Sequence, residues 1–70
     1  MIIKIKQPDL ETLATEARAQ RNLLLIESDW TMISDAPVDQ VAWADYRQAL
    51  RDITAQEGFP YSVEWPMKPE

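Results

Sequence analysis

The sequence predicts a mainly α-helical protein, an antiparallel two-helix hairpin with a short extended segment at each end. Residues 9–28 and 39–57 repeat apolar side chains three and four positions apart, the period of a helix with one buried face. Residues 29–38 between them contain the turn formers Ser, Asp and Pro, as expected of a connection between antiparallel helices. Residues 58–70 form an aromatic and proline-containing tail. Because 70 residues leave room for one domain, we expect residues 1–70 to form a single domain.

An extended or strand-like N-terminal segment is predicted over residues 1–8. Ile3 and Ile5 alternate with lysines, as the two faces of a strand do, and Pro8 ends any extended pairing. Residues 61–65 alternate in the same way. The two segments could therefore pair as a small β-ribbon within one chain, or each could pair with a second chain.

The first helix is predicted over residues 9–28. Asp9 can cap its N-terminus by accepting a hydrogen bond from a free backbone N–H group. The apolar positions of this helix are Leu10, Leu13, Ala14, Ala17, Leu24 and Leu25. Its last turn, residues 23–26, is apolar on nearly every side, so we expect something besides the second helix to cover this end.

The second helix is predicted over residues 39–57, with Asp39 as its N-cap. Its apolar stripe consists of Val41, Ala42, Tyr46, Ala49, Leu50 and Ile53, with Trp43 at the edge. Gly58 is the only glycine and follows the helix, where a left-handed residue is favoured. The sequence therefore predicts that Gly58 ends this helix in a left-handed conformation.

Composition and charge exclude several classes of function. Histidine and cysteine are both absent, which excludes Ser-His-Asp and Cys-His catalysis and thiolate metal sites. The single glycine excludes a glycine-rich phosphate loop. Seven basic residues are scattered against twelve acidic ones, and a net charge of −5 disfavours nucleic acid binding. We therefore expect no catalytic, cofactor-binding or metal-binding residues and no enzymatic activity.

Acidic side chains fit structural positions rather than a reaction site. Asp29, Asp35 and Asp39 surround the connection, where caps and turn formers are expected, and the pattern of a calcium loop is missing. Asp45 and Asp52 lie seven residues apart on the second helix, where a solvated face is favoured over a catalytic pair. The longest apolar run, residues 23–26, is too short to span a bilayer. We therefore expect a cytoplasmic protein with no membrane partner.

Three residues spaced by four on the second helix are candidates for binding a partner: Trp43, Arg47 and Arg51. Arginine can stack on tryptophan at this spacing, and both residue types are enriched in interaction hot spots. The alternative is that the arginines pair with glutamates of the first helix, such as Glu16 or Glu27.

The three tryptophans, Trp30, Trp43 and Trp65, are many for a chain of this length. All three could pack in the core. Alternatively at least one is an exposed anchor, and Trp65 beside the terminal prolines is the best candidate. The candidate partner-binding residues are therefore Trp30, Trp43, Arg47, Arg51 and Trp65.

Several segments occur in an order that is similar to a known family. They are Arg-Asn-Leu-Leu-Leu at residues 21–25, Ser-Asp-Trp-Thr at 28–31, Asp-Ala-Pro-Val-Asp at 35–39, Trp-Ala-Asp-Tyr-Arg-Gln-Ala-Leu-Arg-Asp-Ile at 43–53, Gly-Phe-Pro at 58–60 and Val-Glu-Trp-Pro at 63–66. This order resembles the tail assembly chaperone family of tailed phages and prophages, and a similar module ends some tail fibre and tail fibre assembly proteins. The resemblance covers about two thirds of the chain. Met32 and Thr54 depart from it, since Gln and Pro are common there.

The resemblance implies a small non-enzymatic factor that helps a phage tail or tail fibre protein fold or assemble in the host bacterial cytoplasm. The alternative is a structural module that remains in the virion tail or tail fibre. Self-association is also compatible with the short chain and with the apolar end of the first helix.

Overall fold

The computed structural model describes residues 9–69. The helices within them are α1 (Leu10–Ser28), the 3₁₀ helix η1 (Asp29–Met32), α2 (Gln40–Arg51) and the 3₁₀ helix η2 (Asp52–Ala55). The described residues contain no strand, and the prediction of a mainly α-helical protein is confirmed. The extended segment predicted over residues 1–8, with any ribbon it would form, lies outside the described residues. No helix in this part of the chain is both long and apolar enough to cross a membrane.

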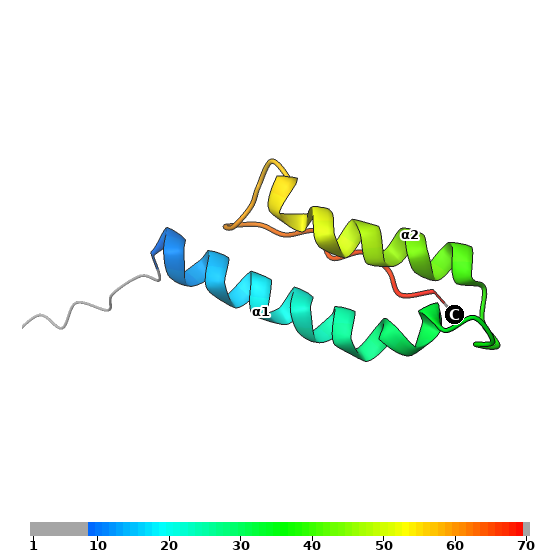
Figure 1. The fold of residues 1–70 in the computed structure, drawn as a ribbon. Helices are drawn as coiled ribbons and strands as arrows, with labels where there is room; N and C mark the ends of the chain where they lie inside the picture. Colours follow the sequence, from blue (N-terminus) through cyan, green and yellow to red (C-terminus); the bar gives the residue numbers. More distant parts are fainter. Residues whose placement is uncertain (1–8, 70) are drawn as a thin grey trace, which may run out of the picture.

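α1 and α2 lie side by side and run in opposite directions, joined at one end by η1 and residues 33–39 (Figure 1). After η2 the chain turns back, and residues 58–69, here called the tail, run along the helix pair toward its joined end (Figure 1). The Gln56 side chain donates to the carbonyl of Glu64 and accepts from its N–H group, both at 2.8 Å. Side-chain and backbone contacts therefore hold the tail against the helices.

Both helix starts have the predicted caps. The N–H group of Thr12 donates to Oδ1 of Asp9 at 2.8 Å, and this bond lowers the pKa of the Asp9 carboxyl group. The N–H group of Ala42 donates to Oδ1 of Asp39 at 3.1 Å at the start of α2. The two N-cap predictions are confirmed because each depends only on a side chain reaching a backbone group three residues ahead.

The second helix is shorter than the predicted span of residues 39–57. Its α-helical part ends at Arg51, and η2 continues the chain to Ala55 in a tighter conformation. Gln56 is extended, and its side chain bonds to the backbone of Glu64 in the tail. Gln56, which was predicted to be helical, instead contacts the tail.

The left-handed conformation predicted for Gly58 is wrong, because no glycine of the described chain has a positive φ. A close approach of the backbone explains the residue instead. The N–H group of Ser62 donates to the carbonyl of Gly58 at 2.9 Å, and a Cβ atom on Gly58 would lie 2.8 Å from the carbonyl oxygen of Ser62. Only a residue without a side chain fits this turn, which contains the cis peptide bond between Phe59 and Pro60.

The core is small and lies on the inner face of α2. Trp43, Tyr46 and Leu50 form a buried cluster. Three partly buried residues pack against it, namely Leu24, Leu25 and Val38. Ile53 is fully buried, as its place in the predicted stripe requires. The predicted apolar stripe included Val41, but Val41 is 73% exposed. Trp43 was predicted at the edge of the stripe, whereas it is buried in the core cluster. Two residues along a helix turn about 200°, so Val41 and Trp43 face opposite ways.

Candidate partner-binding site

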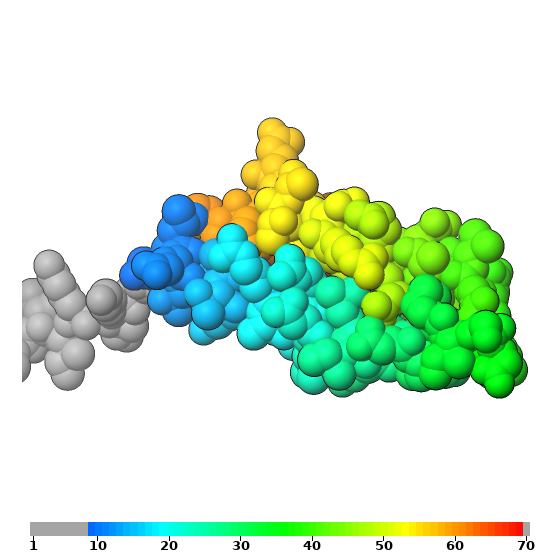
Figure 2. All heavy atoms as spheres, in the orientation of Figure 1, coloured from blue at the N-terminus to red at the C-terminus, as the bar shows by residue number. Residues whose placement is uncertain are grey.

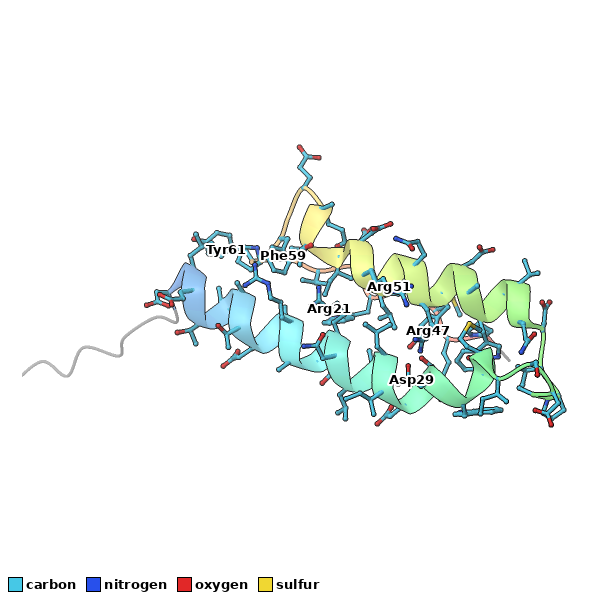
Figure 3. All side chains as sticks on the ribbon, viewed as in Figure 1. Arg21, Asp29, Arg47, Arg51, Phe59 and Tyr61 are labelled. Atoms are coloured by element: carbon cyan, nitrogen blue, oxygen red, sulfur yellow. The ribbon has the colours of Figure 1, made fainter. Side chains whose placement is uncertain are left out.

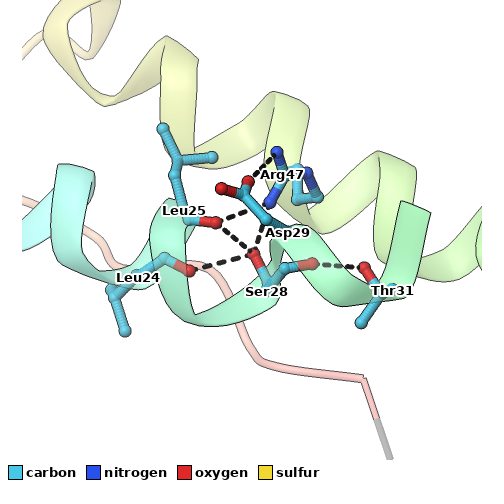
Figure 4. Close-up of polar contacts among 6 residues, drawn as sticks. All are labelled: Leu24, Leu25, Ser28, Asp29, Thr31 and Arg47. Atoms are coloured by element: carbon cyan, nitrogen blue, oxygen red, sulfur yellow. Dashed lines mark hydrogen bonds and ion pairs between the residues drawn. The ribbon is translucent and has the colours of Figure 1, made fainter. Parts of the chain in front are cut away.

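Arg47 ties α2 to the end of α1 (Figure 4). Its Nη1 group donates to the carbonyl of Leu25 and to Oγ of Ser28, both at 2.7 Å. Its Nη2 group donates to Oδ1 of Asp29 at 2.8 Å. The guanidinium therefore places positive charge at the C-terminal end of α1, where the helix dipole favours a cation.

The hydroxyl groups around Arg47 continue this network. Oγ of Ser28 lies 2.9 Å from the carbonyl oxygen of Leu24, to which it can donate. Oγ1 of Thr31 donates to the carbonyl of Ser28 at 2.6 Å, and Thr31 is fully buried. The side-chain amide of Gln40 donates to the carbonyls of Thr31 and Ile33 across the connection. The network consequently fixes the direction in which the chain leaves α1.

The structure places the two candidate arginines differently. Arg47 is only 8% exposed, and its acidic partner is Asp29 rather than Glu16 or Glu27. Arg51 is exposed and makes no ion pair within the described residues. Figure 3 shows Arg47 and Asp29 near the joined end of the helices, with Phe59 and Tyr61 at the other end. Of these two arginines, only Arg51 is free to meet a partner without disturbing the fold.

The three tryptophans do not gather in one place. Trp43 is 5% exposed and meets Tyr46 edge to face, with ring centroids 5.6 Å apart. Trp30 packs on Trp43 with centroids 6.3 Å apart and remains 49% exposed. Trp65 is exposed in the tail and belongs to neither pair. Buried Trp43 therefore packs beneath Trp30, and Trp30 and Trp65 are both exposed to solvent.

A cavity of about 90 Å³ lies between the aromatic side chains and the tail. Its lining consists of Leu24, Glu27, Ser28, Trp30, Trp43, Tyr46 and Lys68. Burial raises the pKa of the Tyr46 hydroxyl, and the negative charge of Glu27 adds to the effect. The Nε1 group of Trp43 is buried without a hydrogen-bond partner in the described part. Sites that enclose a drug-sized ligand have volumes of about 300–1,000 Å³, several times that of this cavity.

Lys68 is the member of this cavity that sequence reasoning missed. Its Nζ atom lies 5.9 Å from the centroid of the Trp43 ring, within the range of a cation–π contact. Lys68 and Trp43 are far apart in the sequence, and only the return of the tail brings them together (Figure 1). No local pattern in the sequence could have paired them. Among residues 9–69, no group of three or more acidic side chains is placed to hold a metal ion.

The outer side of α1 carries exposed apolar side chains. Leu23 and Ile26 of α1 are exposed, Ile26 to 67%, and Trp30 follows in η1, where its ring packs on Trp43 and remains half exposed. Figure 2 shows α1 forming one edge of the molecule, with no described segment over the outward side. We expected something besides the second helix to cover this end: the tail comes close to Leu24, which lines the cavity together with Lys68, whereas Leu23 and Ile26 stay exposed. This surface therefore remains available to another molecule.

Comparison with known proteins identifies a family. The family described as phage tail assembly chaperone protein matches residues 14–70. No curated protein and no solved structure matches the chain. The matched region contains most of α1, all of α2 and the tail, and so every residue that lines the aromatic cavity. Since the match extends over most of the sequence, the chain belongs to the phage tail assembly chaperone family.

Proposed function

We propose that the chain is a non-enzymatic assembly chaperone that binds a phage tail or tail fibre protein in the host bacterial cytoplasm. Membership of the phage tail assembly chaperone family supports this role. The observation that supports the binding surface is the exposure of Leu23 and Ile26 near the end of α1 and of Trp30 in η1, which follows directly. Apolar residues gathered on a surface mark contacts with other macromolecules. Such a surface can shield an apolar segment of a tail protein until assembly needs it.

The candidate residues take two roles in this proposal. Trp30, Trp65 and Arg51 are exposed and contact the tail protein directly. Trp43 and Arg47 are buried and act as positioning residues, because Trp43 packs under Trp30 and Arg47 fixes the end of α1. Binding of this kind needs no cofactor or metal ion.

A co-purification experiment tests the proposal. The tagged chain is expressed during prophage induction, and bound proteins are identified by mass spectrometry. A tail or tail fibre protein should be enriched with the parent chain. Trp30→Ala should reduce its recovery about tenfold, because a tryptophan that becomes buried in an interface carries a large share of the binding energy. Val41→Ala is the control, because Val41 faces away on α2. Absence of any tail protein would contradict the proposal.

Purified phage particles distinguish the two ways in which such a protein could act. A chaperone that leaves after assembly should be absent from the particles. Stoichiometric presence of the chain would indicate instead a structural module that remains in the virion tail or tail fibre.

A further inference from the structure

The aromatic cavity has a buried inner end and a charged mouth. Trp43 and Tyr46 are the buried aromatic residues of its lining. Glu27, Trp30 and Lys68 are its exposed lining residues. The plane of the Trp43 ring is inclined by 88° to that of Tyr46 and by 54° to that of Trp30. Rings at such angles can surround one group from several sides, as in the aromatic sites that bind ammonium ligands.

The charge of the lining favours a positive group in this cavity. Glu27 makes no ion pair with another residue of the described part. Burial raises the pKa of the Tyr46 hydroxyl, and the negative charge of Glu27 adds to this effect, so the carboxylate acts on the aromatic lining. The faces of aromatic rings are also negative. The cavity therefore offers a cation both ring faces and a carboxylate.

Lys68 supplies such a cation from within the chain. Its Nζ atom lies 5.9 Å from the centroid of the Trp43 ring, near the outer limit of about 6 Å for a cation–π contact. Lys68 is exposed and forms no ion pair with a described residue, Glu27 included. One cation–π contact at an exposed site is weak. Lys68 therefore marks the position of a cation without holding it firmly.

The end of the tail is attached less firmly than its beginning. Two hydrogen bonds hold Glu64 to the side chain of Gln56, and the Phe59 ring lies 5.6 Å from the guanidinium of Arg18. Residues 65–69 make no backbone–backbone hydrogen bond with other described residues. Lys68 can therefore leave the cavity while the part of the tail before residue 65 keeps its contacts.

We propose that the aromatic cavity binds a lysine or arginine side chain of the phage tail protein, and that this side chain takes the place of Lys68. The inference rests on the proposed function and adds the chemistry of one contact. The incoming cation faces the Trp43 ring and approaches Glu27. The cavity is several times smaller than a site for a drug-sized ligand, which favours the end of one side chain over a whole ligand.

Blocked pentapeptides that differ only in the central residue serve as probes, with lysine, norleucine or glutamate at that position. Norleucine keeps the aliphatic stem of lysine and lacks its charge. Binding to the full chain is followed by the NMR signals of the indole N–H groups, which Trp30→Phe and Trp65→Phe assign by removing one signal each. Peptide concentrations extend into the millimolar range, because a single side-chain contact is weak.

The lysine peptide should shift the signals of Trp30 and Trp43 until they saturate. It should bind at least about fivefold more tightly than the norleucine peptide, since only lysine gains the cation–π contact and the attraction to Glu27. The glutamate peptide should bind more weakly than either. Equal binding of the lysine and norleucine peptides, or no shift with lysine, would overturn the inference.

Substitution of Lys68 tests whether it competes for the cavity. Lys68→Ala removes the internal cation, so the lysine peptide should bind about two- to fivefold more tightly than it does to the parent. Lys68→Arg keeps the charge and should bind the peptide no more tightly than the parent. If Lys68→Ala binds the peptide with unchanged or lower affinity, Lys68 is no competitor and the inference fails.

Substitution of Glu27 tests the carboxylate at the mouth. Glu27→Gln should weaken binding of the lysine peptide by about two- to fivefold. Glu16→Gln is the matched control, because Glu16 is an exposed acid about three turns earlier on α1 and its loss changes the net charge equally. Circular dichroism confirms that both variants fold. Equal affinities of the two variants would contradict a contact with Glu27.

Co-purification from induced cells separates this inference from the proposed function. If the parent and Glu27→Gln recover a phage tail protein equally well, the chaperone role stands and the cavity is not its site. If the lysine peptide binds but no phage tail protein is recovered, the proposed function fails and the partner is wrong. Sedimentation equilibrium addresses exchange of tails between two copies. A monomer supports the inference, and a dimer that Lys68→Ala dissociates would make a second copy the occupant.

Discussion

Replacement of Arg47 by methionine should remove much of the stability of the fold. The methionine keeps the apolar stem of the side chain but loses the donors to the carbonyl of Leu25, to Oγ of Ser28 and to Asp29. Hydrogen bonds to charged groups contribute about 1.5–3 kcal/mol. Here Leu25 and Ser28 retain other contacts, since Oγ of Ser28 lies near the carbonyls of Leu24 and Leu25. Loss of the hydrogen bonds from Arg47 to Leu25 and Ser28 should therefore cost about 2 kcal/mol of unfolding free energy.

The ion pair with Asp29 adds less than these bonds. The side chain of Asp29 is 63% exposed, and exposed ion pairs contribute at most about 1 kcal/mol. The total expected for Arg47→Met is therefore about 2–3 kcal/mol. A domain of this length has about 3–5 kcal/mol of stability, so the variant should lose between about 40% and all of it. The corresponding fall in melting temperature is about 10–20 °C.

Urea unfolding followed by circular dichroism measures these free energies. Arg51→Met is the matched control, because Arg51 is the exposed arginine one turn along α2, and its cost should stay within about 0.5 kcal/mol. Asp29→Asn separates the ion pair from the capping of α1 and should cost less than about 1 kcal/mol. The reasoning is refuted if Arg47→Met is as stable as the parent. It is also refuted if Asp29→Asn costs as much as Arg47→Met.

Three further changes test other parts of the structure. Gly58→Ala should destabilise the protein by about 1–2 kcal/mol in thermal unfolding, since the new Cβ would meet the carbonyl oxygen of Ser62; a gain in stability would contradict this account of the turn. Burial raises the pKa of Tyr46, so the unfolded chain releases this proton first, and stability should fall as the pH rises above about 10. Tyr46→Phe should lose less stability than the parent between neutral and alkaline pH, and an identical loss would exclude Tyr46 as the cause. Gln56→Leu removes both side-chain bonds to the backbone of Glu64, so the Glu64 amide should exchange with deuterium faster, and unchanged exchange would mean that other contacts hold the tail.

The local features of the fold could be predicted from the sequence. Asp9 and Asp39 cap their helices because an Asp carboxylate just before a helical pattern can accept a hydrogen bond from a free backbone N–H group of the first turn. The burial of Tyr46, Leu50 and Ile53 follows from the period of the apolar stripe. These features depend on neighbours within one or two turns of the same helix.

The features that were missed depend on the return of the tail and on the connection. The α-helical part of the second helix ends at Arg51, and Gln56 bonds to Glu64, a contact that helical preferences do not contain. Gly58 was predicted to end a helix in a left-handed conformation, whereas it is needed because the backbone of Ser62 approaches it closely.

The partners of Arg47 could not be predicted for a similar reason. The four-residue spacing showed that Arg47 and Arg51 lie on the same side of α2, but it could not predict that Asp29 would pair with Arg47. That pairing depends on how η1 turns the chain after Ser28. The exposed side of α1 was indicated in part, since residues 23–26 are apolar on nearly every side. The cavity with Lys68 left no local signal at all.

Oxidative footprinting of the chain in complex with its tail protein would examine the proposed binding surface residue by residue. Hydroxyl radicals label exposed side chains, and mass spectrometry compares the labelling of the free and bound chain. The proposed contact predicts that labelling of Leu23, Ile26 and Trp30 falls on binding, while Val41 on the far side of α2 is labelled equally in both states. Protection of Val41 with unchanged labelling of Ile26 and Trp30 would show that the tail protein binds elsewhere.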